Sequence, residues 1–368
     1  MYTYNYSFVK QYADRALLRR IDKAARNLSD RIVALDLASV GISEYNQRYI
    51  RNKFKSPIGC MQKYAYLLAM AIGDSDKPLQ ELTVVDYGGG NGLFGLLAKE
   101  VGVGTVIYND IYDVSCADIV VFADALGLAL QDIVHGDLPD LIGRVQEKGY
   151  HIDAVVSYDV IEHIYDIDGY FRQLHQLGNA PLRIVFGSAA NTENPDINAA
   201  LVAHQHALET TDREKVWGHK ERDSLASYHA LRCDIINALE LGFSAEEVEQ
   251  LATDTRGLIK ADIEAQARQY KETGKLSYQP TDTYNTCDPM TGNWAEHLLP
   301  FDHVQQVLND GGFDTQILPG FQPYSFLWRR RMYRHGLNAL ISLMGRQGLR
   351  YAPYYIVMGS LREKAAQG

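Results

Sequence analysis

The 368-residue sequence predicts an α/β fold built on a mostly parallel sheet. Three observations support this prediction. Short apolar runs alternate with segments of helical periodicity between residues 82 and 186. A turn containing several glycines joins the first apolar run to the helix that follows it. This alternation then breaks off and resumes only near the carboxyl terminus. Regular alternation of strands and helices places helices on both faces of a parallel sheet.

The first 80 residues precede the alternation and are predicted to be helical. Apolar residues at three- and four-residue steps, separated by charges, indicate an amphipathic helix over residues 13–40. A second helix is expected to begin near Glu44, and a buried helix is expected over Met61–Ile72. Three residues of the second helix would share one face: Tyr45, Arg48 and Tyr49.

The first predicted strand, the glycine turn and the next helix lie in the segment 82–100, LTVVDYGGGNGLFGLLAKE. Its pattern is D-x-G-x-G-x-G, formed by Asp86, Gly88, Gly90 and Gly92. Glycine has no Cβ atom, so the backbone can adopt positive φ angles and a ligand can lie against the turn. The segment therefore predicts a ligand-binding turn at the carboxyl end of the first strand.

Three kinds of ligand use a glycine turn of this type. A phosphate-binding loop of nucleotide triphosphatases would end in Gly-Lys-Ser/Thr, which is absent here. A dinucleotide fingerprint reads G-x-G-x-x-G and needs no acid before the glycines. The carboxylate of Asp86 would repel a pyrophosphate and suits a cationic ligand without phosphate. S-adenosylmethionine, which carries an ammonium and a sulfonium, meets that requirement.

On these residues the turn resembles motif I of the class I S-adenosylmethionine-dependent methyltransferases. The string D-V-I-E-H-I at residues 159–164 resembles the motif after the fourth strand of small-molecule members, including the ubiquinone-biosynthesis type. The resemblance covers about half of the chain. It implies a Rossmann-like seven-stranded methyltransferase core whose last two strands form an antiparallel edge, and S-adenosylmethionine as cofactor.

Six further strands complete the predicted sheet, at residues 105–108, 132–135, 153–158, 183–186, 313–318 and 354–361. Ser115 is expected to cap a helix over residues 117–130. Between residues 189 and 295 no strand-like run occurs. Three helices are expected there, over residues 198–217, 224–241 and 244–270, the last with a capping box at Ser244 and Glu247.

The chain is therefore divided into three predicted parts: a helical amino-terminal segment (1–80), the Rossmann-like core (81–188 and 296–368) and a helical insertion (189–295). An insertion at this place follows the carboxyl end of a strand, where open α/β sheets bind ligands. It is predicted to be a lid or substrate-binding subdomain.

The cofactor contacts are expected along the strand ends. Asp110 lies 20 residues past Gly90, the distance at which an acid after the second strand reaches the ribose hydroxyls. The resemblance implies that an acid after the third strand, Asp137, bonds the adenine amino group and that Leu138 packs on the ring. The complete predicted set is Asp86, Gly88, Gly90, Gly92, Asp110, Asp137, Leu138, Tyr158 and Asp159.

Methyl transfer is an SN2 displacement, in which positioning alone supplies much of the rate acceleration. A base is needed only when the acceptor atom carries a proton at neutral pH, as a hydroxyl does. His163 is the first candidate, because it follows the fourth strand by one turn. His297 is the second, at the return from the insertion, and His219 is the third. All three could instead bind substrate.

The composition of the chain limits the kinds of partner that we expect it to bind. The net charge is −10, with basic termini and an acidic centre, which argues against a nucleic-acid track. No metal is predicted, because His204 and His206 are two residues apart and the four cysteines form no C-x-x-C pair. No 18-residue apolar run and no signal peptide are evident, so a cytoplasmic location is expected.

The predicted function is transfer of a methyl group from S-adenosylmethionine to an oxygen or nitrogen of a polar small molecule or saccharide. An NAD-dependent oxidoreductase and a non-catalytic S-adenosylmethionine-binding module remain as alternatives, and the oligomeric state is not predicted. The segment Arg329–Arg334 could contact a phosphate or sugar nucleotide, touch an anionic membrane, or form a solvated face or dimer contact.

Overall fold

The computed structural model describes residues 11–214, 224–325 and 327–363. The chain divides into two compact units, which we describe separately. Unit 1 comprises Met1–Val160, Asp168–Ala189 and Phe301–Gly368, and unit 2 comprises Ile161–Ile167 and Ala190–Pro300. The predicted insertion ended at residue 295, whereas unit 2 extends to Pro300 and also includes the short segment after the fourth strand.

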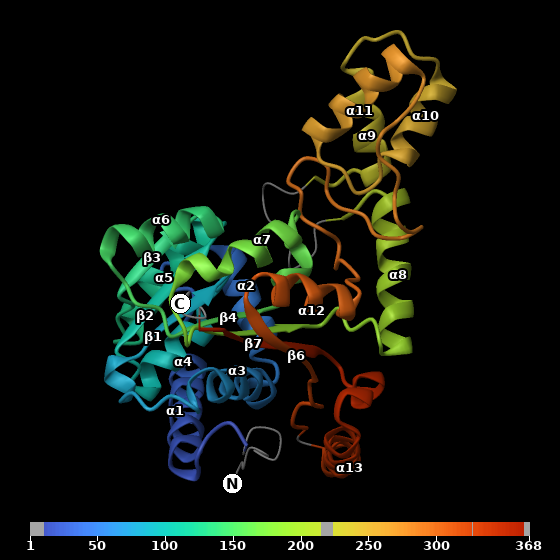
Figure 1. Cartoon of the computed structure of the whole chain (residues 1–368). Coiled ribbons are helices and arrows are strands. Elements are labelled where there is room, and N and C mark those ends of the chain that lie inside the picture. The colour runs from blue at the N-terminus through green and yellow to red at the C-terminus, as the bar shows by residue number, and fades with distance from the viewer. Residues whose placement is uncertain (1–10, 215–223, 326, 364–368) are drawn as a thin grey trace, which may run out of the picture. The chain divides into compact units, whose positions relative to one another are not determined.

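Unit 1 is built on a seven-stranded sheet with the order β3-β2-β1-β4-β5-β7-β6 (Figure 1). Its strands are β1 (Thr83–Tyr87), β2 (Thr105–Asp110), β3 (Asp132–His135), β4 (Ala154–Tyr158), β5 (Arg183–Ser188), β6 (Phe313–Pro319) and β7 (Tyr355–Leu361). The first five strands pair in parallel, and β7 is antiparallel to both β5 and β6. The predicted Rossmann-like seven-stranded core with an antiparallel edge is confirmed.

The strand order reverses between β1 and β4, and open α/β sheets bind ligands at the carboxyl ends of the strands beside such a switch point. The glycine turn follows β1 at this place. The topology alone therefore positions the turn where a ligand is expected.

Helices flank this sheet along the whole of unit 1 (Figure 1). They are α1 (Arg15–Ala34), α2 (Glu44–Lys53), α3 (Pro57–Ile72), α4 (Leu93–Val101), α5 (Asp113–Ala125), α6 (Leu138–Lys148), α7 (Ile167–Gln173), α12 (Phe301–Asp310) and α13 (Trp328–Met344), with α7 beginning in unit 2. Apolar residues of α1, α3 and α4 share one buried core with those of β1 and β2. The predicted amino-terminal helices are thus confirmed, and they cover the sheet.

Two local predictions need correction. Ser115 does not cap a helix over residues 117–130, because α5 begins at Asp113, two residues before Ser115, and Ser115 is buried within the helix. The residue at the cap position is Tyr112. The predicted helix over residues 244–270 is two helices, α10 and α11, because Gly257 adopts φ +86° between them.

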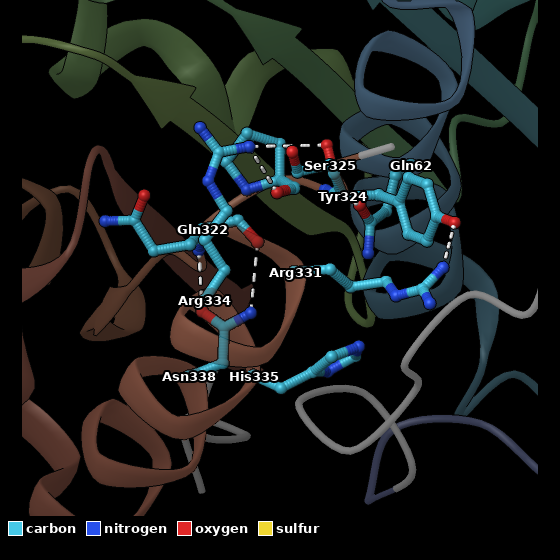
Figure 2. A pocket seen from close by; sticks show the side chains of 9 residues that line it. Gln62, Gln322, Tyr324, Ser325, Arg331, Arg334, His335 and Asn338 are labelled. Atoms are coloured by element: carbon cyan, nitrogen blue, oxygen red, sulfur yellow. Dashed lines mark hydrogen bonds between the residues drawn. The ribbon is translucent and has the colours of Figure 1, made fainter. Parts of the chain in front are cut away.

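A 3-10 helix, η5 (Gly345–Tyr351), leads from α13 to β7. The inner side of α13 is fixed by Asn338, whose side chain accepts a hydrogen bond from Gln322 N at 2.7 Å and donates one to Gln322 O at 3.0 Å (Figure 2). Asn338 and Ile341 are the buried residues of this helix. The remaining faces of α13 are largely exposed.

Unit 2 contains the helices α8 (Pro195–Thr210), α9 (Tyr228–Asn237), α10 (Ala245–Asp254) and α11 (Lys260–Thr273). Residues of α9, α10 and α11 form a separate apolar core, which includes Ile236, Leu251 and Ile263. The predicted capping box of α10 is confirmed: Ser244 N donates to Glu247 Oε2 at 2.7 Å, and Glu247 N donates to Ser244 Oγ at 3.2 Å.

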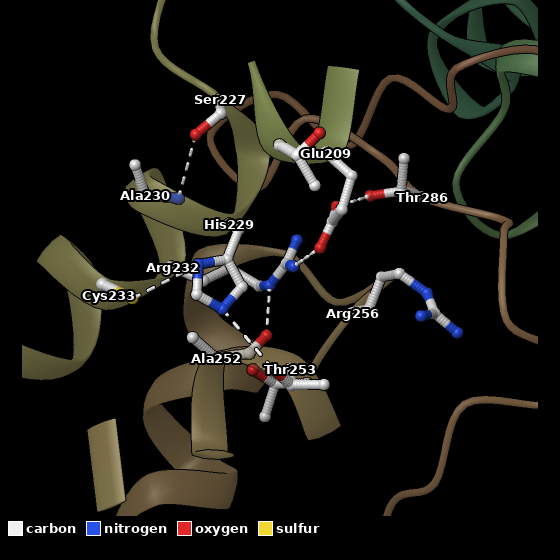
Figure 3. Close-up of polar contacts among 12 residues, drawn as sticks. Glu209, Ser227, His229, Ala230, Arg232, Cys233, Ala252, Thr253, Arg256 and Thr286 are labelled. Carbon is white, nitrogen blue, oxygen red and sulfur yellow. Dashed lines mark hydrogen bonds and ion pairs between the residues drawn. The ribbon is translucent and has the colours of Figure 1, made fainter. Parts of the chain in front are cut away.

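A buried ion pair joins α8 to α9 within unit 2 (Figure 3). The Arg232 side chain is fully buried, pairs with Glu209 and donates from Nε to Ala252 O at 2.6 Å. The second carboxylate oxygen of Glu209 accepts a hydrogen bond from Thr286 Oγ1 at 2.8 Å. The charge of Arg232 is therefore neutralised locally.

Candidate cofactor-binding site

The turn between β1 and α4 adopts the backbone that its glycines permit. Gly88, Gly90 and Gly92 have φ angles of +62°, +55° and +69°. A Cβ atom on Gly88 would lie 2.6 Å from Val160, and one on Gly92 would lie 2.1 Å from Ile119. A Cβ atom on Gly90 would meet nothing within 4 Å. The outer glycines thus pack against protein, whereas Gly90 leaves space in which a ligand can approach the backbone.

Asp86 lies beneath this turn and is only 3% exposed. Its Oδ2 accepts a hydrogen bond from Gly95 N of α4 at 2.9 Å. Burial raises the pKa of Asp86 to about 7; the Gly95 N–H and Lys53 oppose this shift, and the nearby Asp110 carboxylate adds to it. Asp86 therefore holds the start of α4 in place, and its direct contact with a cofactor stays a prediction.

Asp110, the last residue of β2, is tied to the turn. Its Oδ2 accepts a hydrogen bond from Gly90 N at 2.8 Å, and its Oδ1 accepts one from Tyr112 N at 2.8 Å. The Tyr108 hydroxyl donates to Gly90 O at 2.6 Å. A carboxylate has about four acceptor positions, so Asp110 keeps acceptor capacity for ligand hydroxyls. The structure thus brings Asp110 to the open glycine, and its contact with a ribose stays a prediction.

Asp137 and Leu138 lie at the start of α6. Asp137 is exposed and caps this helix in a capping box with Asp140, whose Oδ2 accepts from Asp137 N at 3.1 Å. Partial burial and the Asp140 carboxylate raise the pKa of Asp137. Leu138 is buried. The contacts of both residues with an adenine ring stay predictions.

Tyr158 and Asp159 follow one another at the end of β4. The Tyr158 hydroxyl accepts a hydrogen bond from Lys63 Nζ at 2.7 Å, and the same nitrogen lies 4.3 Å from the Tyr158 ring centroid. Asp159 adopts φ +55° and accepts a hydrogen bond from Ala189 N at 3.1 Å. Burial lowers the pKa of Lys63, and Asp159 opposes that shift. Sequence reasoning missed Lys63, which lies 95 residues from Tyr158.

Asn91 is a second residue that sequence reasoning missed. It lies inside the glycine turn, and neither its side-chain oxygen nor its nitrogen has a hydrogen-bond partner in the described part of the chain, although both are buried. Asn91 borders a narrow crevice that is also lined by Asn46 and Ile50 of α2. The helix α2 therefore lies beside the turn. The signal in the sequence was a polar residue within a run of glycines.

The two catalytic candidates lie together in unit 2. His163 Nδ1 lies 2.8 Å from Trp294 O, and its Nε2 lies 3.9 Å from Glu296 Oε1. The His297 ring stacks on the Trp294 ring, with centroids 4.1 Å apart. Glu296 adopts φ +61°, an unusual backbone for this residue type. The third candidate, His219, lies outside the described residues.

No metal was predicted, and His204 and His206 belong to neither of the two candidate metal-ligand groups among the described residues. One group consists of Glu162, His163 and Glu296, and the other of His229, Cys233 and Glu249. Within each group the potential ligand atoms all lie within 4.8 Å of one another. Because His163 Nδ1 bonds to a carbonyl oxygen, its Nε2 is free to accept a proton or a cation.

Comparisons with known proteins find only solved structures of low sequence identity and low structural similarity. No protein-family model matches the sequence, and no curated protein matches it. A solved structure of an S-adenosylmethionine-dependent methyltransferase from Mesorhizobium loti is similar at 16% identity, with a TM-score of 0.39 over 80% of this chain and 95% of that chain.

Two further solved structures are similar at the same level. A protein from Streptococcus mutans, assigned as a methyltransferase of the same kind, has 15% identity and a TM-score of 0.30 over 38% of this chain. The CMeT domain of the citrinin polyketide synthase has 10% identity and a TM-score of 0.39 over 86% of this chain and 57% of that domain. The chain spans only 37% of the length of the Streptococcus mutans protein.

Proposed function

We propose that the protein is an S-adenosylmethionine-dependent methyltransferase. The observation that carries this proposal is the pair of carboxylates, Asp86 and Asp110, beside a glycine turn whose central residue is open to a ligand. The Asp86 carboxylate, directly before the glycines, disfavours a pyrophosphate and favours a cationic amino-acid nucleoside, and Asp110 suits the ribose. An NAD-dependent oxidoreductase would place the pyrophosphate of NAD against this turn, where the Asp86 carboxylate disfavours it.

The residues of the turn fit this cofactor. The open side of Gly90 admits the methionine part, and the acceptor positions of Asp110 suit the ribose hydroxyls. Asn91, with both side-chain polar atoms unpartnered in the described part of the chain, offers a donor and an acceptor at the same turn. Asp137 and Leu138 would hold the adenine, and Tyr158 and Asp159 would border the methyl group. When bound, the cofactor supplies an electrophilic methyl group for in-line displacement.

The proposed acceptor is an oxygen or nitrogen of a polar small molecule or saccharide. His163 is the proposed base for a hydroxyl acceptor, because the hydrogen bond of Nδ1 to Trp294 O fixes the ring and leaves Nε2 as the basic atom. His297 is the second candidate, held by stacking on Trp294. A cytoplasmic location belongs to the same proposal.

Turnover tests the proposal. The purified protein is incubated with S-adenosylmethionine and fractions of a small-molecule extract, and S-adenosylhomocysteine is measured. Production that depends on one fraction supports a methyltransferase. Binding of the cofactor without production in any fraction would favour the alternative, a non-catalytic binding module.

Replacement of His163 then tests the base. With the acceptor in hand, His163→Asn is expected to lower kcat about 100-fold or more for a hydroxyl acceptor, in line with the usual contribution of a general base. Unchanged turnover would exclude His163 from proton transfer. Its control is His229→Asn, which alters a partly buried histidine of α9 in the same unit.

A further inference from the structure

The outer face of α13 is apolar and exposed. Its exposed apolar residues all lie within an arc of about 140° around the helix axis, at 100° per residue, which places them on one side of the helix. They are Trp328, Met332, Tyr333, Leu340 and Leu343, and we call this set the α13 apolar face. Tyr333 and Leu343 are 71% and 86% exposed. Side chains of this size and exposure grouped on one helix mark an interaction surface.

The orientation of this face is fixed by the opposite side of the helix. Asn338 and Ile341 are buried, and Asn338 holds the backbone of Gln322 through two hydrogen bonds (Figure 2). The helix therefore cannot roll to hide its apolar face without losing these bonds. The exposure of the face is a property of the packed fold.

Positive charge surrounds the α13 apolar face. Residues 328–351 contain six arginines and no aspartate, glutamate or lysine. Arg329 and Arg330 are exposed, and no ion pair involves either of them in the described ranges. The η5 residue Arg346 differs, since it pairs with Asp302 of α12. The charge next to the apolar face is thus uncompensated by the described protein.

A basic cavity lies on the inner side of the same helix. It is partly open to solvent and is lined by Gln62, Tyr324, Arg331, Arg334 and His335 among other residues, with no carboxylate (Figure 2). Arg331 Nη1 donates to Tyr324 Oη at 2.8 Å, and Arg334 Nη1 donates to Pro323 O at 2.8 Å. Each guanidinium has five N–H donors, so both keep donors for an anion such as a phosphate.

We propose that α13 docks on the surface of an anionic phospholipid bilayer. The α13 apolar face enters the boundary between headgroups and acyl chains, as the apolar side of an interfacial helix does. Arg329 and Arg330 contact lipid phosphates, and Arg331 and Arg334, which line the basic cavity, supply further N–H donors to a headgroup phosphate. No helix in the described part of the chain is long and apolar enough to cross a membrane, which is consistent with docking at the surface.

The arginines and the apolar face together favour an anionic bilayer over a second copy of the chain or a nucleic acid. A symmetric dimer through the same face would bring the arginines of one copy against those of the other. A nucleic acid would use the arginines and leave Trp328, Met332 and Leu343 in water. A bilayer with anionic headgroups satisfies both the apolar face and the arginines at once.

Vesicle co-sedimentation of the full chain tests the proposal. We expect binding to vesicles of phosphatidylcholine with about 30% phosphatidylglycerol, weaker binding to phosphatidylcholine alone, and release by added salt. Leu343→Ser and Met332→Ser should each lower the binding constant about fivefold to tenfold, and the pair should abolish sedimentation. Arg329→Gln with Arg330→Gln should lower binding only to the anionic vesicles.

The matched control is Val33→Ser, which removes an apolar side chain that is 62% exposed on α1, and it should bind vesicles as the unaltered chain does. Equal vesicle binding by the unaltered chain and the Leu343→Ser, Met332→Ser pair would overturn the proposal. So would concentration-dependent dimerisation through this face without vesicle binding. Stabilisation of the protein by inorganic phosphate without any vesicle binding would also overturn it, by assigning the cavity to a free anion.

Discussion

In unit 1 the buried carboxylate of Asp86 lies near a second carboxylate, Asp110, whereas in unit 2 the buried guanidinium of Arg232 pairs with Glu209. Burial raises the pKa of Asp86 to about 7, although the Gly95 N–H and Lys53 act in the opposite direction. Two further hydrogen bonds support the Arg232 pair, one from Thr286 to Glu209 and one from Arg232 to the carbonyl oxygen of Ala252. Unit 1 thus places two carboxylates close together, whereas unit 2 pairs its buried guanidinium with a carboxylate.

This difference in charge balance indicates a binding role for the carboxylates of unit 1 and a structural role for the ion pair of unit 2. Groups with strongly shifted pKa values cluster at functional sites, because a ligand can stabilise the charge that the protein alone does not. A buried ion pair that is supported by further hydrogen bonds instead fixes the packing of the elements that it joins. Each of the following predictions concerns a change either to the carboxylate site of unit 1 or to the ion pair of unit 2.

The largest effect that we expect is a loss of stability when the ion pair of unit 2 is broken. Glu209→Ala leaves the buried charge of Arg232 without its partner and should lower the free energy of unfolding by about 3–5 kcal/mol. The control is Glu249→Ala, which removes a largely exposed partner of His229 and should cost less than about 1 kcal/mol. Urea denaturation followed by circular dichroism measures both. Equal stability of the two variants would show that the Arg232 pair is not structural.

The next effect concerns the open glycine. Gly90→Ala should weaken S-adenosylmethionine binding about 100-fold, because the added Cβ enters the space that the ligand needs. Its control is Gly127→Ala, since Gly127 also has a positive φ, +58°, and a Cβ atom added there would also meet nothing within 4 Å. Both variants should lose about 1–2 kcal/mol of stability from backbone strain. Equal ligand affinity in the two variants would contradict a ligand at Gly90.

The third effect is the pH dependence of binding, which is smaller for each pH unit than the effect of Gly90→Ala. A cationic ligand favours ionised Asp86, so affinity for S-adenosylmethionine should rise about tenfold per pH unit between about pH 5 and 7 and then level off. Asp86→Asn should remove this slope. Calorimetric titration over this range measures it, and the same slope in Asp86→Asn would assign the proton to another group.

The stability of the protein without ligand should depend on pH in the opposite direction, because the contribution of Asp86 to stability falls as the pH rises. The folded-state pKa of Asp86 lies above its ordinary value of 3.8, so its contribution to stability is present at low pH and is lost as the pH rises towards about 7. The Asp86→Asn variant should therefore lose less stability than the unaltered chain between about pH 4 and 7.

The sheet could be predicted from the sequence because its strands are short apolar runs between turns. The residues 132–135 were predicted as a strand with the bounds of β3. The split between α10 and α11 was missed, because a single glycine, Gly257, within a helical pattern is often tolerated. The glycine turn could be predicted because its spacing is local in the sequence.

Contacts between distant residues could not be predicted in the same way. His163 meets the Trp294 backbone 131 residues away, and Lys63 meets Tyr158 95 residues away. Each contact depends on tertiary packing, and no local spacing encodes it. The burial of Asp86 was missed for a related reason, since the sequence pattern shows a carboxylate before the turn but not its hydrogen bond with Gly95 in the first turn of α4.

Calorimetric titration of the full chain with three ligands at about pH 7.5, above the pKa of Asp86, tests the central claim, that the turn accepts a cationic amino-acid nucleoside. The account predicts binding of S-adenosylmethionine, weaker binding of S-adenosylhomocysteine, which lacks the sulfonium charge, and no binding of NAD. Binding of NAD in place of the two adenosyl ligands would contradict it.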